Sequence, residues 1–173
     1  PHKDIPAPDV GSNGIIMNHM MRAYNHRSSQ RTLATFTGKP VECGGSLGRE
    51  AATGQGVVLC IEKYAKLKNI SLNGKSYIIQ GFGNVGSFTS QLLSKAGMTC
   101  VGIGDHTGYL LCEEGFNVFK CAEHVKTHGN LAEYPNGVKV SKAEFFRVNC
   151  DFVIPAALEM QIDADIAATM NCT

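Results

Sequence analysis

The run Gly81-Phe82-Gly83-Asn84-Val85-Gly86 follows an apolar segment and carries three glycines at the spacing G-x-G-x-x-G. Between a strand and a helix, the first glycine lets the chain reverse and the second lets bare main chain approach a diphosphate. The third lets the new helix pack on the strand. The helix start then offers free N–H groups and a positive dipole end to the anion. We therefore predict dinucleotide binding at Gly81, Phe82, Gly83, Asn84, Val85 and Gly86; a glycine-rich turn without a ligand is the alternative.

Asp105 closes a second apolar run, and it lies about 20 residues after Gly86, where such folds place an acidic residue. A carboxylate binds a ribose diol and repels a 2′-phosphate, and neither His106 nor Thr107 supplies an arginine or lysine to hold that phosphate. The charge therefore favours NAD as the cofactor, with NADP as the alternative.

Apolar periodicity and turn residues place these positions on alternating strands and helices. We expect Ile16, Met20 and Tyr24 on the buried face of the first helix, and an apolar side of the second at Val58, Ile61, Ala65 and Leu67. The alternation predicts an α/β fold with a Rossmann-like, doubly wound, mostly parallel sheet and helices on both faces. The expected strands are 76–80, 99–103, 138–140 and 152–154, and the expected helices are 14–25, 50–68, 84–96, 116–128, one begun by Ser141 and 163–170. The expected N-terminal caps are Ser12 or Asn13 for the first helix, Asn84 for the third, and Ser141 and Asp163 for the last two, and Gly129 is expected to end the helix 116–128.

Composition narrows the classes of partner. The 173-residue chain has 43% hydrophobic and 18% charged residues and a net charge of +1. This charge gives no electrostatic reason to expect binding to nucleic acid or to a membrane surface. No apolar run approaches the roughly 20 residues of a membrane helix. Seven cysteines without a C-x-x-C pair, and six histidines without an H-E-x-x-H motif, predict free thiols in a reducing compartment and no metal site.

Small residues are dense between positions 37 and 54, in Thr37-Gly38-Lys39-Pro40, Gly44-Gly45-Ser46-Leu47-Gly48-Arg49 and Ala52-Thr53-Gly54. Such residues permit the close approach of a flat ligand or of another segment of backbone. The local sequence leaves two alternatives open, a binding loop and a long structural loop.

Together with Pro6-Ala7-Pro8-Asp9, Gln80 to Gly86 and Ile154-Pro155-Ala156-Ala157, these motifs closely resemble the glutamate dehydrogenase family. More widely, they resemble the glutamate, leucine, phenylalanine and valine dehydrogenase superfamily, in the same order and over essentially the whole chain. The resemblance implies reversible oxidative deamination of L-glutamate to 2-oxoglutarate and ammonia with NAD(P). It also implies that 1–36 is a cleft-lining segment leading into the coenzyme domain, and that 37–173 is the NAD(P)-binding domain, truncated at both ends.

The resemblance assigns further roles. Asp9 matches the family's catalytic aspartate, which moves a proton between the reacting nitrogen and water. Thr53 matches a hydroxyl near the nicotinamide carboxamide, and Arg49 lies near the substrate end of the cleft. Ala156 and Ala157 follow the strand 152–154, where small side chains leave room for a flat ring. The local alternative for Asp9 is an Asx turn or helix cap, and for Thr53 it is a hydrogen bond to the main chain at a helix start. Arg49 could instead be a solvated or salt-bridged surface residue, and the two alanines could simply pack at the start of a helix.

The family's substrate-binding lysines would lie before Pro1 and its glutamate and asparagine motif after Thr173, so we expect dinucleotide binding without turnover by this chain. Gly104 stands where the family commonly has serine. Family members usually form hexamers, and the full-length protein is expected to be a homo-oligomer in the cytoplasm, or alternatively in the mitochondrial matrix. The rival functions are a leucine, phenylalanine or valine dehydrogenase and a non-catalytic nucleotide-sensing domain.

Overall fold

The computed structural model describes residues 2–172, which divide into two compact units, one ending at Ala52 and one beginning at Thr53. The first unit contains the helix α1 (Gly14–Arg27), the short 3-10 turn η1 (Val41–Cys43) and connecting loops. As expected, Asn13 caps α1, because its side chain accepts a hydrogen bond from the Ile16 N–H at 3.1 Å. The predicted functional division into 1–36 and 37–173 stays a prediction.

The buried face of α1 differs from the predicted one. Met17 and Met21 are buried, whereas the three predicted side chains remain 39–43% exposed: Ile16, Met20 and Tyr24. The apolar residues of α1 recur on more than one face, so periodicity does not decide which face the rest of the unit covers.

The second unit is built on a five-stranded sheet in the order β4-β3-β2-β1-β5. β1 is parallel to both β2 and β5, and β3 is antiparallel to both β2 and β4, so only β3 runs against the others. This arrangement confirms the mostly parallel sheet. The strands are β1 (Ser76–Gln80), β2 (Thr99–Asp105), β3 (Gly108–Leu111), β4 (Val138–Val140) and β5 (Phe152–Pro155).

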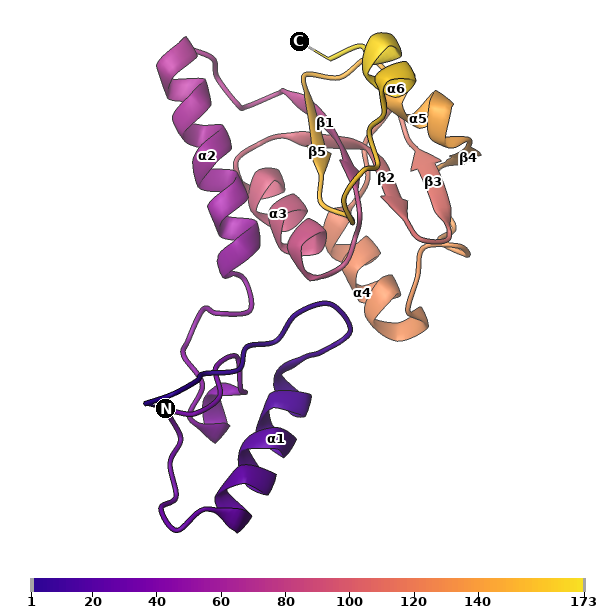
Figure 1. Ribbon diagram of the computed structural model, residues 1–173. Coiled ribbons are helices and arrows are strands. Elements are labelled where there is room, and N and C mark those ends of the chain that lie inside the picture. Colours follow the sequence, from indigo (N-terminus) through magenta and orange to yellow (C-terminus); the bar gives the residue numbers. More distant parts are fainter. Residues whose placement is uncertain (1, 173) are drawn as a thin grey trace. The chain divides into compact units, whose positions relative to one another are not determined.

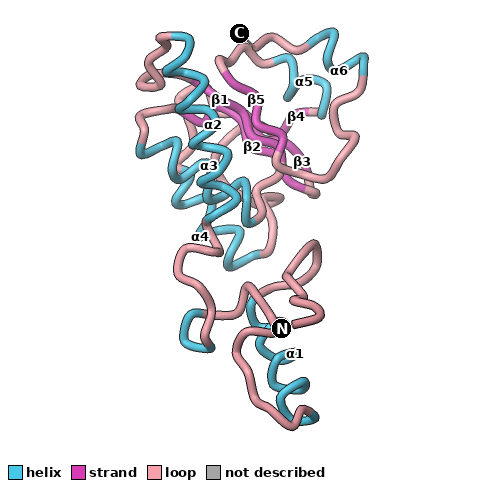
Figure 2. Tube along the Cα trace, turned by 60° about the vertical axis from the view of Figure 1, so that its left-hand side comes forward, coloured by secondary structure: helices cyan, strands magenta, loops and turns pink. Residues whose placement is uncertain are grey.

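Helices cover both faces of this sheet, as predicted (Figures 1 and 2). Alternate residues of β1 point to opposite faces. Tyr77 and Ile79 join the core beneath α2, α3 and α4, and Ile78 packs with Phe145 and Phe146 beneath α5 and α6. No helix within residues 2–172 is long and apolar enough to cross a membrane. The helices are α2 (Ala52–Lys68), α3 (Asn84–Lys95), α4 (Val118–His128), α5 (Lys142–Arg147) and α6 (Ala164–Thr169).

Helix boundaries follow the predicted caps with one exception. Ser141 forms a capping box with Glu144, and Asp163 accepts from the Ile166 N–H at 2.8 Å. Gly129 ends α4 in the left-handed conformation. Asn84, however, does not cap α3: it is the first helical residue, and Gly83 occupies the cap position without a side-chain bond.

Two further expectations are corrected. The sequence does not predict β3, because four residues after a tight turn carry too little periodicity; the turn at His106 and Thr107 folds β3 back on β2. In α2, Leu67 is 70% exposed, while Val58 and Ala65 form the buried side.

An ion pair joins the amino ends of β1 and β5. Asp151 Oδ1 lies 2.7 Å from Lys75 Nζ, and Oδ2 accepts hydrogen bonds from the Ser76 N–H at 2.8 Å and from its hydroxyl at 3.0 Å. The bond from Lys75, followed by the main-chain bond from Ser76, lowers the pKa of Asp151. A carboxyl with a lowered folded pKa stabilises the protein above its unfolded pKa, and this stabilisation is lost as the pH falls through the folded value.

We therefore expect Asp151→Asn to lower the free energy of unfolding by about 1 kcal/mol at pH 7. The difference from wild type should shrink as the pH approaches 3, because the wild-type carboxyl then binds a proton in the unfolded chain, which reduces the advantage of its ionised, paired form in the folded protein. Urea unfolding at both pH values measures this, with the exposed Glu113→Gln as the matched control. A deficit that is equal at both pH values would contradict the assignment.

Candidate functional site

The corner after β1 has the form that dinucleotide binding requires. Gly81 has φ +91°, which glycine adopts readily, and its N–H donates to the carbonyl oxygen of Gly104 at 2.7 Å. A Cβ on Gly81 would overlap the main chain of Ala156. The chain can therefore reverse here only because Gly81 lacks a side chain.

The other two glycines differ in what surrounds them. A Cβ on Gly86 would overlap the carbonyl oxygen of Gly81 and lie 3.5 Å from the Ile79 side chain, so Gly86 allows α3 to pack on β1. A Cβ on Gly83 would meet nothing within 4 Å, and Gly83 has an ordinary φ of −78°. Nothing in the described chain needs a glycine at position 83, and the space beside it is open.

The start of α3 leaves main-chain donors available. The Ser87 N–H bonds the Gly83 carbonyl at 2.9 Å, but no acceptor within residues 2–172 takes the N–H groups of Gly83, Asn84 or Val85. The side chain of Phe82 is buried in the core, so Phe82 presents only its main chain. Free donors at the positive end of a helix dipole are suited to binding an anion such as a diphosphate.

Strand register brings the other predicted residues of this unit to the same edge. Gln80 pairs with Gly104 on β2 and with Pro155 on β5, so the segments after these three parallel strands emerge side by side. The Ala156 N–H donates to the Gln80 carbonyl at 2.7 Å. The edge thus gathers the glycine turn, Asp105, and the alanines Ala156 and Ala157.

Asp105 already has structural partners. Its Oδ1 accepts hydrogen bonds from the N–H of Thr107 at 2.7 Å and from the Thr107 hydroxyl, and its Oδ2 accepts from the Leu131 N–H at 2.7 Å. The carboxylate holds the turn between β2 and β3 and the segment after α4. Because a carboxylate has roughly four lone-pair positions, a ribose hydroxyl would share Asp105 with these bonds.

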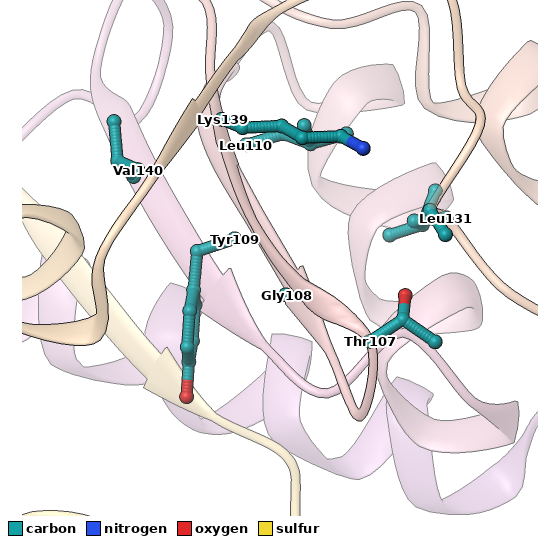
Figure 3. Close-up of a pocket in the computed structure, with 8 residues that line it drawn as sticks. Thr107, Gly108, Tyr109, Leu110, Leu131, Lys139 and Val140 are labelled. Carbon is teal, nitrogen blue, oxygen red and sulfur yellow. The ribbon is translucent and has the colours of Figure 1, made fainter.

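A small cavity of about 160 Å³ lies beside this turn (Figure 3). It is smaller than the roughly 300–1,000 Å³ of most ligand pockets, and the glycine turn does not line it. The cavity alone is therefore not a dinucleotide site, although Lys139 of β4 and Thr107 of the β2–β3 turn both line it. Its lining residues are Thr107, Gly108, Tyr109, Leu110, Leu131, Ala132, Lys139 and Val140.

In the first unit, Asp9 lies on a segment with a fixed main chain. Its N–H donates to the Ser12 hydroxyl at 2.7 Å, and its carbonyl accepts from the Ser12 N–H at 2.9 Å. The carboxylate accepts from the Val10 N–H at 2.8 Å and is exposed. The turn presents Asp9 to solvent and does not use its carboxylate as a helix cap.

The segment that precedes Asp9 packs on the small-residue loop. The Thr37 N–H bonds the Pro6 carbonyl at 3.1 Å, and the Pro8 ring fills the space where a Cβ of Gly38 would lie. Gly45 likewise packs on the main chain of Lys39. These two glycines serve internal packing, which is the structural alternative for this loop.

The two remaining predicted residues are exposed. Arg49 belongs to the first unit, and no acidic side chain in the described residues pairs with it. Thr53 is the second residue of α2, in the other unit. Within residues 2–172, neither side chain forms a hydrogen bond, so their roles stay predictions.

The buried cysteines of the core are in their unreactive, protonated form. Burial raises the pKa of Cys100 and Cys121, and it raises the pKa of Cys150 to about 11. These thiols therefore stay protonated at neutral pH. Within residues 2–172, no three histidine, cysteine, aspartate or glutamate side chains are grouped so as to hold a metal ion.

Sequence reasoning assigned no role of its own to Gln80. It is 3% exposed, and its side chain donates hydrogen bonds to Tyr109, which lies two strands away on β3, and to Gln161, which lies in the loop after β5. The available signal was an amide at the end of an otherwise apolar strand, directly before the glycine turn.

A sequence profile described as Glutamate/Leucine/Phenylalanine/Valine dehydrogenase matches residues 44–173 of this chain. The chain belongs to this family. The match covers the glycine turn, Asp105 and both alanines, and it confirms the family resemblance of the motifs.

Among curated family members, the glutamate dehydrogenase of Thermotoga maritima is 39% identical over 165 residues, covering 95% of this chain and 40% of that protein. The NAD-specific glutamate dehydrogenase of Clostridioides difficile is 40% identical over 173 residues, covering 97% of this chain and 41% of that protein. The chain thus spans about 40% of the length of these relatives.

Solved structures of the family agree in fold. The hetero-hexameric glutamate dehydrogenase of Thermus thermophilus superposes with a TM-score of 0.90 at 29% identity, covering 98% of this chain and 40% of that one. Plasmodium falciparum glutamate dehydrogenase gives a TM-score of 0.85 at 26% identity, covering 98% and 38%.

Substitution by alanine should destabilise the protein more at Gly86 than at Gly83. We expect Gly86→Ala to lower the free energy of unfolding by about 2 kcal/mol or more, because its methyl group collides with the Gly81 carbonyl. Gly83→Ala should cost no more than about 1 kcal/mol, the difference between glycine and alanine at an N-cap. Denaturant unfolding of both variants tests this, and equal losses would contradict the described corner.

Proposed function

We propose that this chain is the coenzyme-binding part of an NAD-dependent glutamate dehydrogenase. The full-length enzyme would interconvert L-glutamate with 2-oxoglutarate and ammonia. The observation that carries the proposal is the corner at Gly81 to Gly86, in a chain of this family. The space beside Gly83 is open, and the N–H groups of Gly83, Asn84 and Val85 at the start of α3 have no acceptor within residues 2–172.

The dinucleotide would lie along the carboxyl edge of the sheet. Its diphosphate would accept hydrogen bonds from the main chain of Gly83, Asn84 and Val85, with Phe82 completing the turn. Asp105 would bind the adenosine ribose through its remaining acceptor capacity. When bound, the cofactor supplies the acceptor for the substrate hydride.

The nicotinamide end of the dinucleotide would bind beside two alanines and a threonine. Ala156 and Ala157 follow β5 at the same edge as the glycine turn, and their short side chains leave room for a flat ring. The exposed hydroxyl of Thr53 would bond the carboxamide. Both assignments come from the family motifs and the position of these residues.

Asp9 would provide acid–base chemistry. We propose that its exposed carboxylate, on a main chain held by Ser12, accepts and returns the proton that moves between the substrate nitrogen and water. Arg49 would lie toward the substrate, and residues 1–36 would line the cleft. By itself, the chain would bind the dinucleotide without turnover, because it corresponds to only about 40% of the length of its relatives.

The charge of Asp105 and the NAD-specific relative from Clostridioides difficile support NAD. The alternative is NADP, which is favoured by one observation: Lys139 lines the cavity beside Thr107. The substrate assignment follows the relatives named glutamate dehydrogenase. The hetero-hexameric Thermus relative supports an oligomer, and we propose a homo-hexamer for the full-length protein.

Gly83→Ala in the full-length protein tests the binding proposal. Calorimetric titration of NAD and NADP should show tighter binding of NAD to wild type. The variant should bind NAD at least about tenfold more weakly, because a methyl group occupies the space for the diphosphate. Asn117→Ala, which removes the N-cap of α4 away from the site, is the matched control and should bind like wild type. Wild-type binding of neither nucleotide would refute the proposal, and a preference for NADP would refute the cofactor assignment.

Asp9→Asn tests the catalytic proposal. In the full-length protein, we expect kcat for glutamate oxidation to fall roughly 10²- to 10⁴-fold, the usual range for a lost acid–base group, with NAD affinity unchanged. Assays with leucine and phenylalanine should give much lower kcat/KM than glutamate. NAD binding without turnover of any amino acid by wild type would point instead to a nucleotide-sensing protein.

A further inference from the structure

A row of paired residues crosses the sheet at the edge of the proposed site. Gln80 of β1 pairs with Gly104 of β2, and Gly104 pairs with Tyr109 of β3, so their side chains share one face. A Cβ on Gly104 would enter the Tyr109 ring. Because Gly104 has no side chain, the ring lies across β2.

The Tyr109 ring is held in this position. It packs on Phe145 with a centroid distance of 4.8 Å, and Figure 3 shows Tyr109 and Leu110 leaving β3 on opposite sides. The Tyr109 hydroxyl then accepts a hydrogen bond from Gln80 Nε2 at 3.1 Å. The same strand that leads into the glycine turn is thereby tied to the hairpin that follows Asp105.

Gln80 also holds both ends of the segment after β5. Its carbonyl accepts from the Ala156 N–H at 2.7 Å, and its side-chain Nε2 donates to Gln161 Oε1 at 3.3 Å. The residues between these contacts include Ala157 and form the loop 156–161. One residue therefore contacts all three segments that surround the proposed dinucleotide site.

The space that the Gln80 amide fills can be filled by an apolar group of similar size. It is 3% exposed, and within residues 2–172 its Oε1 has no hydrogen-bond partner. A buried polar atom without a partner is unfavourable, and a methionine of similar size would avoid that cost. Gln80→Met can therefore fold well while losing both donated bonds.

We propose that Gln80 is a positioning residue for the dinucleotide site. Its side chain holds the hairpin beyond Asp105 and the loop 156–161 in one arrangement around the glycine turn, and the absence of a side chain at Gly104 makes this network possible. The inference rests on the proposed function. If the network is broken, the loop and hairpin populate other arrangements, and the apparent affinity falls in proportion to the competent fraction.

The experiment measures the NADH dissociation constant and the thermal midpoint of the full-length protein. We expect Gln80→Met to raise the dissociation constant about tenfold and Tyr109→Phe about threefold, with thermal midpoints at or above that of wild type for Gln80→Met. Combining Gln80→Met with Gln161→Met should weaken binding no more than Gln80→Met alone, because both act through one network.

Tyr77→Phe is the matched control. It makes the same chemical change on β1, but the Tyr77 hydroxyl faces α3 and donates to the Ser90 carbonyl at 3.2 Å, so NADH affinity should stay within about twofold of wild type. An unchanged dissociation constant in Gln80→Met overturns the inference, as does equal weakening by Tyr77→Phe and Tyr109→Phe. If Gly83→Ala weakens NADH binding while Gln80→Met does not, this inference fails alone; if wild type does not bind NADH, the proposed function fails with it.

Discussion

The close approach of α3 to the end of β1 is the contact on which the site depends. The carbonyl oxygen of Gly81 occupies the space where any side chain at position 86 would begin, so helix and strand can meet only through main chain. This contact directs the free N–H groups at the start of α3 toward the carboxyl edge of the sheet. An anion site formed in this way needs no charged side chain, which is consistent with the near-neutral charge of the chain.

Parallel pairing determines what surrounds that corner. Because β1, β2 and β5 run in the same direction and pair in register, the segments that follow them emerge at one edge. Asp105 and Ala156 are about 50 residues apart in the chain and reach this edge only through the sheet. Gly104 of β2 also pairs with Tyr109 of the antiparallel strand β3. The row of Gln80, Gly104 and Tyr109 therefore links β3 to β1 across β2.

Asp105 has a structural role beside its proposed functional one. We propose that it binds a ribose, and its carboxylate also holds the β2–β3 turn and the segment around Leu131. At Gly104, the Tyr109 ring fills the space that a side chain would need, which is a physical reason for glycine at this position. In contrast, a side chain at Gly83 would contact nothing in the described residues. A substitution there can therefore change dinucleotide binding while the fold stays intact.

Local sequence was sufficient for features that depend on a few neighbouring residues. The glycine turn, the caps at Asn13, Ser141 and Asp163, and the alternation that specifies an α/β sheet could all be read from it, because each depends on short-range backbone chemistry. The tertiary structure alone decided which face of α1 is buried, the existence of β3 and the partners of Gln80 and Asp105. These depend on contacts between segments far apart in the chain, and local periodicity contains no information about them.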